Sequence, residues 1–192
     1  MKINTLTILT VVTLGTACSL AAQQPHPPAL SKLPAAQEVT VTPAAGIQLL
    51  YQFLATGAQT YACKAGVLST TSIPKAVLAD ADPTSHLTIN HDEPVEKMAR
   101  WTMVDASGKT VAAIQTDKTK AKRFPAPDGI SIAWLRLDPV KGEGSGRFQN
   151  VTSIQRLYTG GGNPAGTTCT TDEAVPYTAH YYFWGTPARP AY

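Results

Sequence analysis

The sequence predicts an all-β protein, a single-domain antiparallel sandwich or barrel with at most a short helix. Short runs rich in β-branched and aromatic residues recur along the chain, and Gly- and Pro-rich turn signals separate them. No segment of ten or more residues free of Pro and Gly has a clean helical period. Together these observations favour strands over helices along the whole folded part.

The first expected strands lie in the first half of the chain. Residues 47–55 are apolar and follow Gly46, and residues 59–64 alternate so that Tyr61 and Cys63 share a face. Residues 75–80 follow a proline and read as the next strand. Residues 92–100 are the expected place for a short helix, beginning after a proline.

The second half continues the pattern. Residues 98–105 and 110–116 flank a Ser-Gly turn, and we expect them to pair as a hairpin. The remaining strands are expected at 130–138, 148–158 and 177–184. The chain is accordingly divided into a signal peptide or lipoprotein leader at 1–22, a Pro-rich linker at 23–43, an all-β domain at 44–186 and a C-terminal tail at 187–192.

The leader has the features of an export signal. Lys2 is followed by an apolar core at 6–14, which is too short to span a bilayer, and by small residues at 15–22. Cleavage after 19–21 gives a free periplasmic or secreted protein. The alternative reads 16–18 as the end of a lipobox, with a lipid on Cys18 and an outer-membrane lipoprotein as the product. Both alternatives remain open, and both place the folded domain outside the cytoplasm.

The composition limits the partners. Charged residues make up 15% of the chain, below the usual quarter, and the net charge is +3. The densest basic run is expected to be a solvated loop or strand edge, and no aromatic residue interleaves with it, so we expect no nucleic-acid partner. The run consists of Lys118, Lys120, Lys122 and Arg123.

Two cysteines remain once Cys18 is assigned to the leader. Cys63 and Cys169 in an oxidising compartment are most simply one disulfide. The alternative is a metal or redox pair, although the chain has no C-x-x-C motif and no histidine close to either cysteine in sequence. The loop closed by the bridge would contain about 100 residues, which gives an upper figure of about 4.7 kcal/mol in the chain-entropy treatment.

Three blocks of sequence carry a family resemblance. Residues 57–63 read G-x-Q-x-Y-x-C, residues 144–169 combine Gly-rich turns with a β-rich run and a cysteine, and residues 175–183 read VPYTAHYYF. With Ile-Ala-Trp-Leu at 132–135, these blocks resemble the DUF3455 family of exported bacterial and fungal proteins, whose name records that no function is established. Two of the blocks carry one cysteine each, so the resemblance implies the Cys63–Cys169 bridge.

The chain departs from the family pattern at two places. His180 stands where the family's closing block has Asp, and the middle of the chain lacks the family's Gly-Pro-Thr before its tryptophan, whose place Trp101 takes. If these positions form a site in the family, this member has altered it.

One cluster has residue types that bind metals. His86, His91 and three carboxylates lie within residues 86–96. Histidines five residues apart do not share a strand face, so a site would need His91, His180 and a carboxylate brought together by folding. The alternative is a polar loop with no ligand.

The closing aromatic run places bulky rings on both faces of its strand. One face belongs to the core, while the other, with His180, Tyr182 and Trp184, is either covered by a loop or open to a small-molecule or carbohydrate ligand. Trp101 completes the candidate ligand-binding set.

No catalytic motif is complete. Ser72 and Lys75 have the Ser-x-x-Lys spacing, but Pro74 lies between them where a helix would be needed. The glycines at 160–162 are followed by Asn-Pro instead of a helix, which argues against a dinucleotide cofactor, and we expect no cofactor. The sequence thus favours a non-catalytic binding or structural protein of the cell envelope. The alternative is an exported hydrolase-like enzyme with a His–carboxylate site, and the sequence leaves the ligand and the oligomeric state open.

Overall fold

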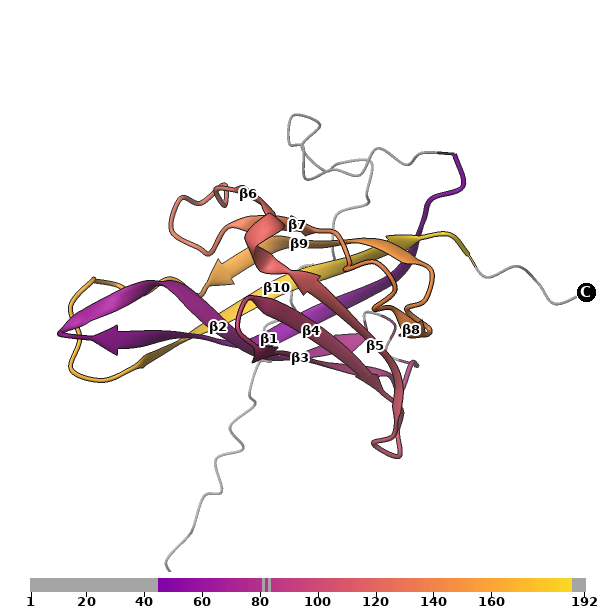
Figure 1. The fold of residues 1–192 in the computed structure, drawn as a ribbon, viewed down its shortest axis with the longest axis horizontal. Coiled ribbons are helices and arrows are strands. Elements are labelled where there is room, and N and C mark those ends of the chain that lie inside the picture. Colours follow the sequence, from indigo (N-terminus) through magenta and orange to yellow (C-terminus); the bar gives the residue numbers. More distant parts are fainter. Residues whose placement is uncertain (1–44, 81, 83, 188–192) are drawn as a thin grey trace, which may run out of the picture.

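The computed structural model describes residues 45–80, 82 and 84–187, which form one curled antiparallel sheet (Figure 1). The prediction of an all-β fold is confirmed, and the sheet order is β6-β7-β9-β10-β1-β2-β3-β4-β5-β8. No helix among the described residues is long and apolar enough to cross a membrane. The strands are β1 (Gln48–Lys64), β2 (Val67–Asp80), β3 (Thr88–Val95), β4 (Met98–Val104), β5 (Thr110–Asp117), β6 (Lys122–Phe124), β7 (Trp134–Leu137), β8 (Ser145–Gly146), β9 (Val151–Gly161) and β10 (Glu173–Gly185).

The strand β1 runs without a break through Gly57, so the strands expected at 47–55 and 59–64 are one strand. Gly57 pairs with Ala76 on β2 and with Tyr177 on β10. A Cβ at Gly57 would lie 2.3 Å from the carbonyl oxygen of Lys75 and 2.5 Å from the Cβ of Ala76. The glycine therefore marks a close approach of two backbones inside the sheet and does not mark a turn.

The prediction of a short helix at 92–100 is wrong. These residues form the end of β3, a tight turn and the start of β4, with Val95 paired to Met98. Lys97 has a φ of 68°, and its backbone N–H donates to Oε1 of Glu93 at 2.6 Å. A side-chain hydrogen bond across the turn thus replaces the backbone bonds that a helix would need. The described residues do contain a 3-10 turn, at Lys118–Lys120, which joins β5 to β6.

The remaining predicted strands differ from the observed ones only in where they begin and end. The hairpin of 98–105 and 110–116 is confirmed as β4 and β5. The strand expected at 75–80 begins earlier, at Val67, and the one expected at 130–138 shortens to Trp134–Leu137.

Curling brings distant strands into contact across the concave side. Trp101 on β4 and Tyr181 on β10 are separated in the sheet by β1, β2 and β3. In a flat sheet, four strand spacings would hold them about 19 Å apart. Their ring centroids are 6.0 Å apart. The concave side is therefore enclosed and holds the main hydrophobic core.

The side chains on the two faces of β10 pack into two different hydrophobic clusters. Tyr177, Ala179, Tyr181 and Phe183 alternate onto the concave face and join the main core. Tyr182 and Trp184 point to the convex face, where they pack in a second cluster with Trp134 and Leu157 on neighbouring strands. The period of two along a strand explains this division.

The disulfide prediction is confirmed. Cys63 near the end of β1 and Cys169 in the segment before β10 are bonded, with their Cα atoms 5.9 Å apart. The backbone N–H of Cys63 also donates to Asp172 Oδ1 at 2.8 Å. The bridge ties the protruding β1–β2 hairpin to the segment that precedes β10 (Figure 1).

Candidate functional site

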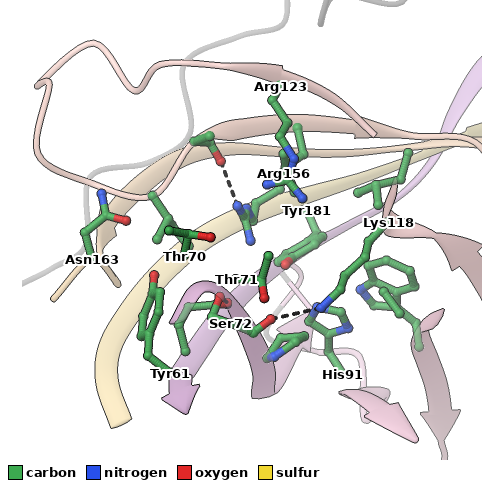
Figure 2. Close-up of a pocket in the computed structure, with 18 residues that line it drawn as sticks. Tyr61, Thr70, Thr71, Ser72, His91, Lys118, Arg123, Arg156, Asn163 and Tyr181 are labelled. Atoms are coloured by element: carbon green, nitrogen blue, oxygen red, sulfur yellow. Dashed lines mark hydrogen bonds between the residues drawn. The ribbon is translucent and has the colours of Figure 1, made fainter. Parts of the chain in front are cut away.

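A cavity of about 380 Å³ opens on the concave side of the sheet (Figure 2). Its volume falls within the range of small-molecule sites. Residues from β1, β2, β3, β4, β6, β7, β9 and β10 line it, so it exists only because the sheet is curled. The lining residues are Gln59, Tyr61, Thr70, Thr71, Ser72, Pro74, His91, Ala99, Trp101, Lys118, Arg123, Ile132, Ala133, Leu135, Leu137, Arg156, Asn163 and Tyr181.

The first signature block lines one wall. Gly57, Gln59, Tyr61 and Cys63 are two residues apart from one another along β1, and Gln59 and Tyr61 both face the cavity. Oε1 of Gln59 accepts a hydrogen bond from Oγ of Ser72 at 2.6 Å. The hydroxyl of Tyr61 donates to the carbonyl oxygen of Gly162 at 2.8 Å. The block therefore shapes the wall and fixes it to β2 and to the turn after β9.

Two arginines enter the cavity from β6 and β9, which lie on either side of β7. Arg123 on β6 pairs with Leu135 on β7, Leu135 pairs with Arg156 on β9, and Arg156 pairs with Tyr181 on β10. Residues in register across adjacent strands share a face, so all four side chains face the cavity. Figure 2 shows the two arginine side chains close together.

Arg156 is a buried cation, 7% exposed. Its Nη2 donates to the carbonyl oxygen of Ala133 at 2.8 Å, while its Nε has no hydrogen-bond partner among the described residues. Arg123 lies at the exposed mouth, and desolvation together with the positive charge of Arg156 lowers its pKa. Within the described part of the chain, neither arginine forms an ion pair.

The cavity lining contains no aspartate or glutamate. A third cation, Lys118, is already engaged: its Nζ pairs with Oε2 of Glu93 and donates to the carbonyl oxygen of Ser72 at 3.0 Å (Figure 2). The prediction of a solvated basic run fits the exposed Lys120 and Lys122, but it is wrong for Lys118, which lies half-buried at the cavity. The uncompensated charge of the site is therefore that of the two arginines.

His91 lies on the wall formed by β3 and β4. It is 3% exposed, its imidazole stacks on Trp101 and contacts Tyr181 edge to face, and its Nδ1–H donates to the carbonyl oxygen of Arg100 at 2.9 Å. Burial lowers the pKa of His91 to about 4, and the charges of Arg156 and Lys118 act in the same direction. His91 is thus neutral near pH 7.

The structure does not bring His91 and His180 together. His91 faces the concave side, while His180 lies on β10 between Ala179 and Tyr181, both of which face the concave core, and so points to the convex side. His86 is exposed. The metal site expected from His91, His180 and a carboxylate therefore does not form, and the described residues contain no group of three or more His, Cys, Asp or Glu that could hold a metal ion.

The sequence left open whether the face of β10 that carries Tyr182 and Trp184 is covered or exposed to a ligand. In the structure this face is covered. Tyr182 and Trp184 are 1% and 5% exposed, and Phe124, Ala126 and Trp134 pack on them. Nε1 of Trp184 donates to Oε1 of Gln155 at 2.8 Å. Of the four candidate ligand-binding residues, Trp101 lines the cavity, while Tyr182, Trp184 and His180 belong to the convex side. Cys18 lies outside the described residues.

Sequence reasoning missed Arg156, Arg123 and Gln59 as site residues. A signal was present: Arg156 is a single charge in the β-rich run 151–158, which is otherwise free of charge. A charged residue in such a strand is rarely buried without a partner. Arg123 could not be found in this way, because nothing in the basic run separates it from its solvated neighbours.

Fold and site together define a disulfide-bonded antiparallel β protein with a cationic cavity inside one curled sheet. The chain belongs to the family described as a protein of unknown function, DUF3455, whose family model matches residues 43–185. Comparison with curated proteins and with solved structures yields no match.

Proposed function

We propose that this chain is an exported, non-catalytic binding protein that holds a small anion in the concave cavity. One observation carries the proposal: the buried guanidinium of Arg156 has a free Nε donor and faces a cavity whose lining has no carboxylate. A buried charge without a counter-charge is costly, and a bound anion offsets that cost. Arginine also presents two parallel donors to a carboxylate or phosphate.

The other donors at the cavity support an anion over a cation. Trp101 lines the cavity, and its Nε1, like Nε of Arg156, has no hydrogen-bond partner among the described residues. Both atoms can only donate. Arg123 adds a second positive charge at the mouth. A cation would find no negative group in this lining, whereas an anion finds donors and charge.

Binding is favoured over hydrolysis because the carboxylates next to His91 in sequence are engaged elsewhere. Asp92 forms a two-point ion pair with Arg100, at 2.7 and 2.9 Å, and Glu93 is paired with Lys118. A His–carboxylate catalytic pair needs the carboxylate within hydrogen-bond reach of the imidazole.

Export is part of the same proposal. It rests on the leader pattern at 1–22 and on the presence of a disulfide, since disulfides persist in oxidising compartments. Labelling cells with a fatty-acid analogue separates the two forms of export: incorporation that disappears in Cys18→Ser indicates a lipoprotein, and no incorporation indicates a free protein.

The binding proposal is tested by calorimetric titration of the purified, oxidised protein with sulfate, phosphate, acetate and benzoate. At least one anion should bind, and Arg156→Met should weaken its binding at least tenfold. The matched control is Arg136→Met, because Arg136 lies on β7 next to Leu135 but faces away from the cavity and pairs with Asp138. Absence of binding for every anion, or equal binding by both variants, would overturn the proposal. Near-UV circular dichroism verifies that each variant is folded.

A further inference from the structure

The chemistry of the cavity is divided between two sides. Figure 2 shows Arg123 and Arg156 on one side of the cavity and His91 on the other. The two arginines come from β6 and β9. The facing wall, from β3 and β4, contributes Ala99, the neutral His91 and the ring of Trp101. Since Lys118 is paired with Glu93, the positive charge that no carboxylate compensates is concentrated at one end of the space.

Part of the lining is apolar, while Gln59, Thr70, Thr71, Ser72 and Asn163 supply polar groups elsewhere. Trp101 and Tyr181 are each 1% exposed and meet edge to face, and Leu135, Leu137 and Ile132 complete this surface. The aliphatic side chains and the faces of the aromatic rings offer no hydrogen bonds to the oxygens of a hydrated inorganic anion. They gain free energy when a ligand's apolar surface leaves water to lie against them.

The volume of the cavity also favours a ligand with an apolar body. A cavity of about 380 Å³ is roughly thirteen times the 30 Å³ share of one water molecule in the liquid. A sulfate or phosphate on Arg156 would leave most of that space to water against aromatic and aliphatic walls. An anion with an apolar body of about ten non-hydrogen atoms would occupy the space and cover the walls.

We propose that the ligand is an amphipathic monocarboxylate, with its carboxylate on Arg156 and its apolar body against Trp101, Tyr181 and Leu137; this rests on the proposed function of the cavity. Arg156 receives the carboxylate through two parallel N–H donors, and Arg123 adds charge at the mouth. A second carboxylate at the far end of the ligand would be buried beside Trp101 and Tyr181, where the lining cation Lys118 is already paired with Glu93, so the site selects against diacids.

The test compares ligands that differ in one feature at a time, by calorimetry on the oxidised protein. Acetate, 4-methylbenzoate and 2-naphthoate share one charge and grow in apolar surface, and 2-naphthoate should bind at least thirtyfold more tightly than acetate. Terephthalate, which replaces the methyl group of 4-methylbenzoate by a second carboxylate, should bind at least tenfold more weakly than 4-methylbenzoate. The neutral 2-naphthamide should bind at least tenfold more weakly than 2-naphthoate.

A variant at the apolar end gives an independent arm. Ala99→Leu places a larger side chain in the lining and should weaken 2-naphthoate at least tenfold while leaving acetate within threefold, with Arg136→Met as the control that changes neither. If the Ala99→Leu protein does not fold, the ligand series on the unaltered protein still tests the monocarboxylate proposal.

The outcomes separate the two proposals. Sulfate or phosphate binding that depends on Arg156 and equals or exceeds 2-naphthoate binding overturns the monocarboxylate assignment and leaves the anion site standing. Equal binding of 2-naphthamide and 2-naphthoate, or of terephthalate and 4-methylbenzoate, also overturns the assignment. No binding of any anion overturns both proposals.

Discussion

The imidazole of His91 lies flat on the indole of Trp101, with ring centroids 4.3 Å apart and an angle of 6° between the planes. The two residues are directly opposite each other on β3 and β4. Tyr181, from the far side of the curl, meets both rings edge to face. The stack buries a titratable side chain in the wall of the cavity, and this has a consequence for stability that can be measured.

We expect the protein to lose stability as the pH falls from about 6.5 toward 4. The pKa of His91 is about 4 in the folded protein and about 6.5 when unfolded, so the unfolded state binds more protons in this window. The stabilisation is present above pH 6.5, and full protonation would cost roughly 3 kcal/mol. Urea unfolding at pH 4.5–7 should show this slope, and His91→Gln should remove most of it.

The control for that slope is His180→Gln. Partial burial also lowers the pKa of His180, so His180 adds its own loss of stability as the pH falls. His180→Gln should remove only that contribution and leave the part of the pH dependence that is due to His91. Asp82, Asp105, Asp117 and Asp128 have pKa values lowered by hydrogen bonds, and their contribution is lost only below about pH 4. A His91→Gln protein with the unaltered slope would contradict the prediction.

Lys118→Met should destabilise the protein strongly, by about 3–5 kcal/mol. The Glu93 side chain is 2% exposed and that of Lys118 is 17% exposed, so loss of the lysine leaves a buried carboxylate without its cation. The double variant Lys118→Met/Glu93→Gln should recover part of the loss, which chemical denaturation measures.

The matched control is Lys120→Met two residues further on. Lys120 pairs with Asp117 at 3.5 Å and is 83% exposed, so its removal should change the free energy of unfolding by less than about 1 kcal/mol. Equal effects of the two lysine variants would mean that the Lys118–Glu93 pair is not desolvated as described.

Gly57→Ala should cost about 1–3 kcal/mol or more, because the added methyl group meets the backbone of β2 at 2.3–2.5 Å. The strands β1 and β2 would have to separate at the centre of the sheet. Gly166→Ala is the control, since a Cβ at Gly166 has nothing within 4 Å. Thermal unfolding of both variants checks the difference, and a Gly57→Ala protein as stable as the Gly166→Ala protein would refute it.

Reduction of the Cys63–Cys169 bridge should lower the free energy of unfolding by about 2–5 kcal/mol. The bridge joins residues 106 apart in sequence, so it constrains a long loop of the unfolded chain. Unfolding with and without reductant gives the difference, and the variant Cys63→Ser/Cys169→Ser should match the reduced protein and be insensitive to reductant. Two free thiols in the native, unreduced protein would contradict the bridge.

Much of the fold could be predicted because strand signals are local. Alternation placed Tyr61 and Cys63 on one face, and the turn at 107–108 predicted the β4–β5 hairpin. The failures were also local. The sequence predicted a break between strands at 56–58 and a short helix at 92–100. The pairing of β1 with its neighbouring strands overrode the first, and the Glu93 side chain overrode the second.

The candidate site was less predictable than the fold. His180 and Trp184 stood out in the sequence because they lie in an aromatic run, yet that run serves two faces and its convex rings are packed. Arg156 drew no attention because a single charge within a strand has no spacing pattern. Its importance depends on what lies across the curl, and no local pattern contains that information.

The sequence by itself determined the all-β class, the face on which each side chain of a strand lies, and the pair of cysteines that join. These follow from the two-residue period of a strand and from covalent chemistry. Only the tertiary structure decided that β3 and β4 curl over β10, so that His91 and Trp101 face Arg156 across one cavity while His180 is left on the other side. Strand period specifies the side of a sheet, but the curl brings together strands far apart in the chain, as in the meeting of Trp101 with Tyr181.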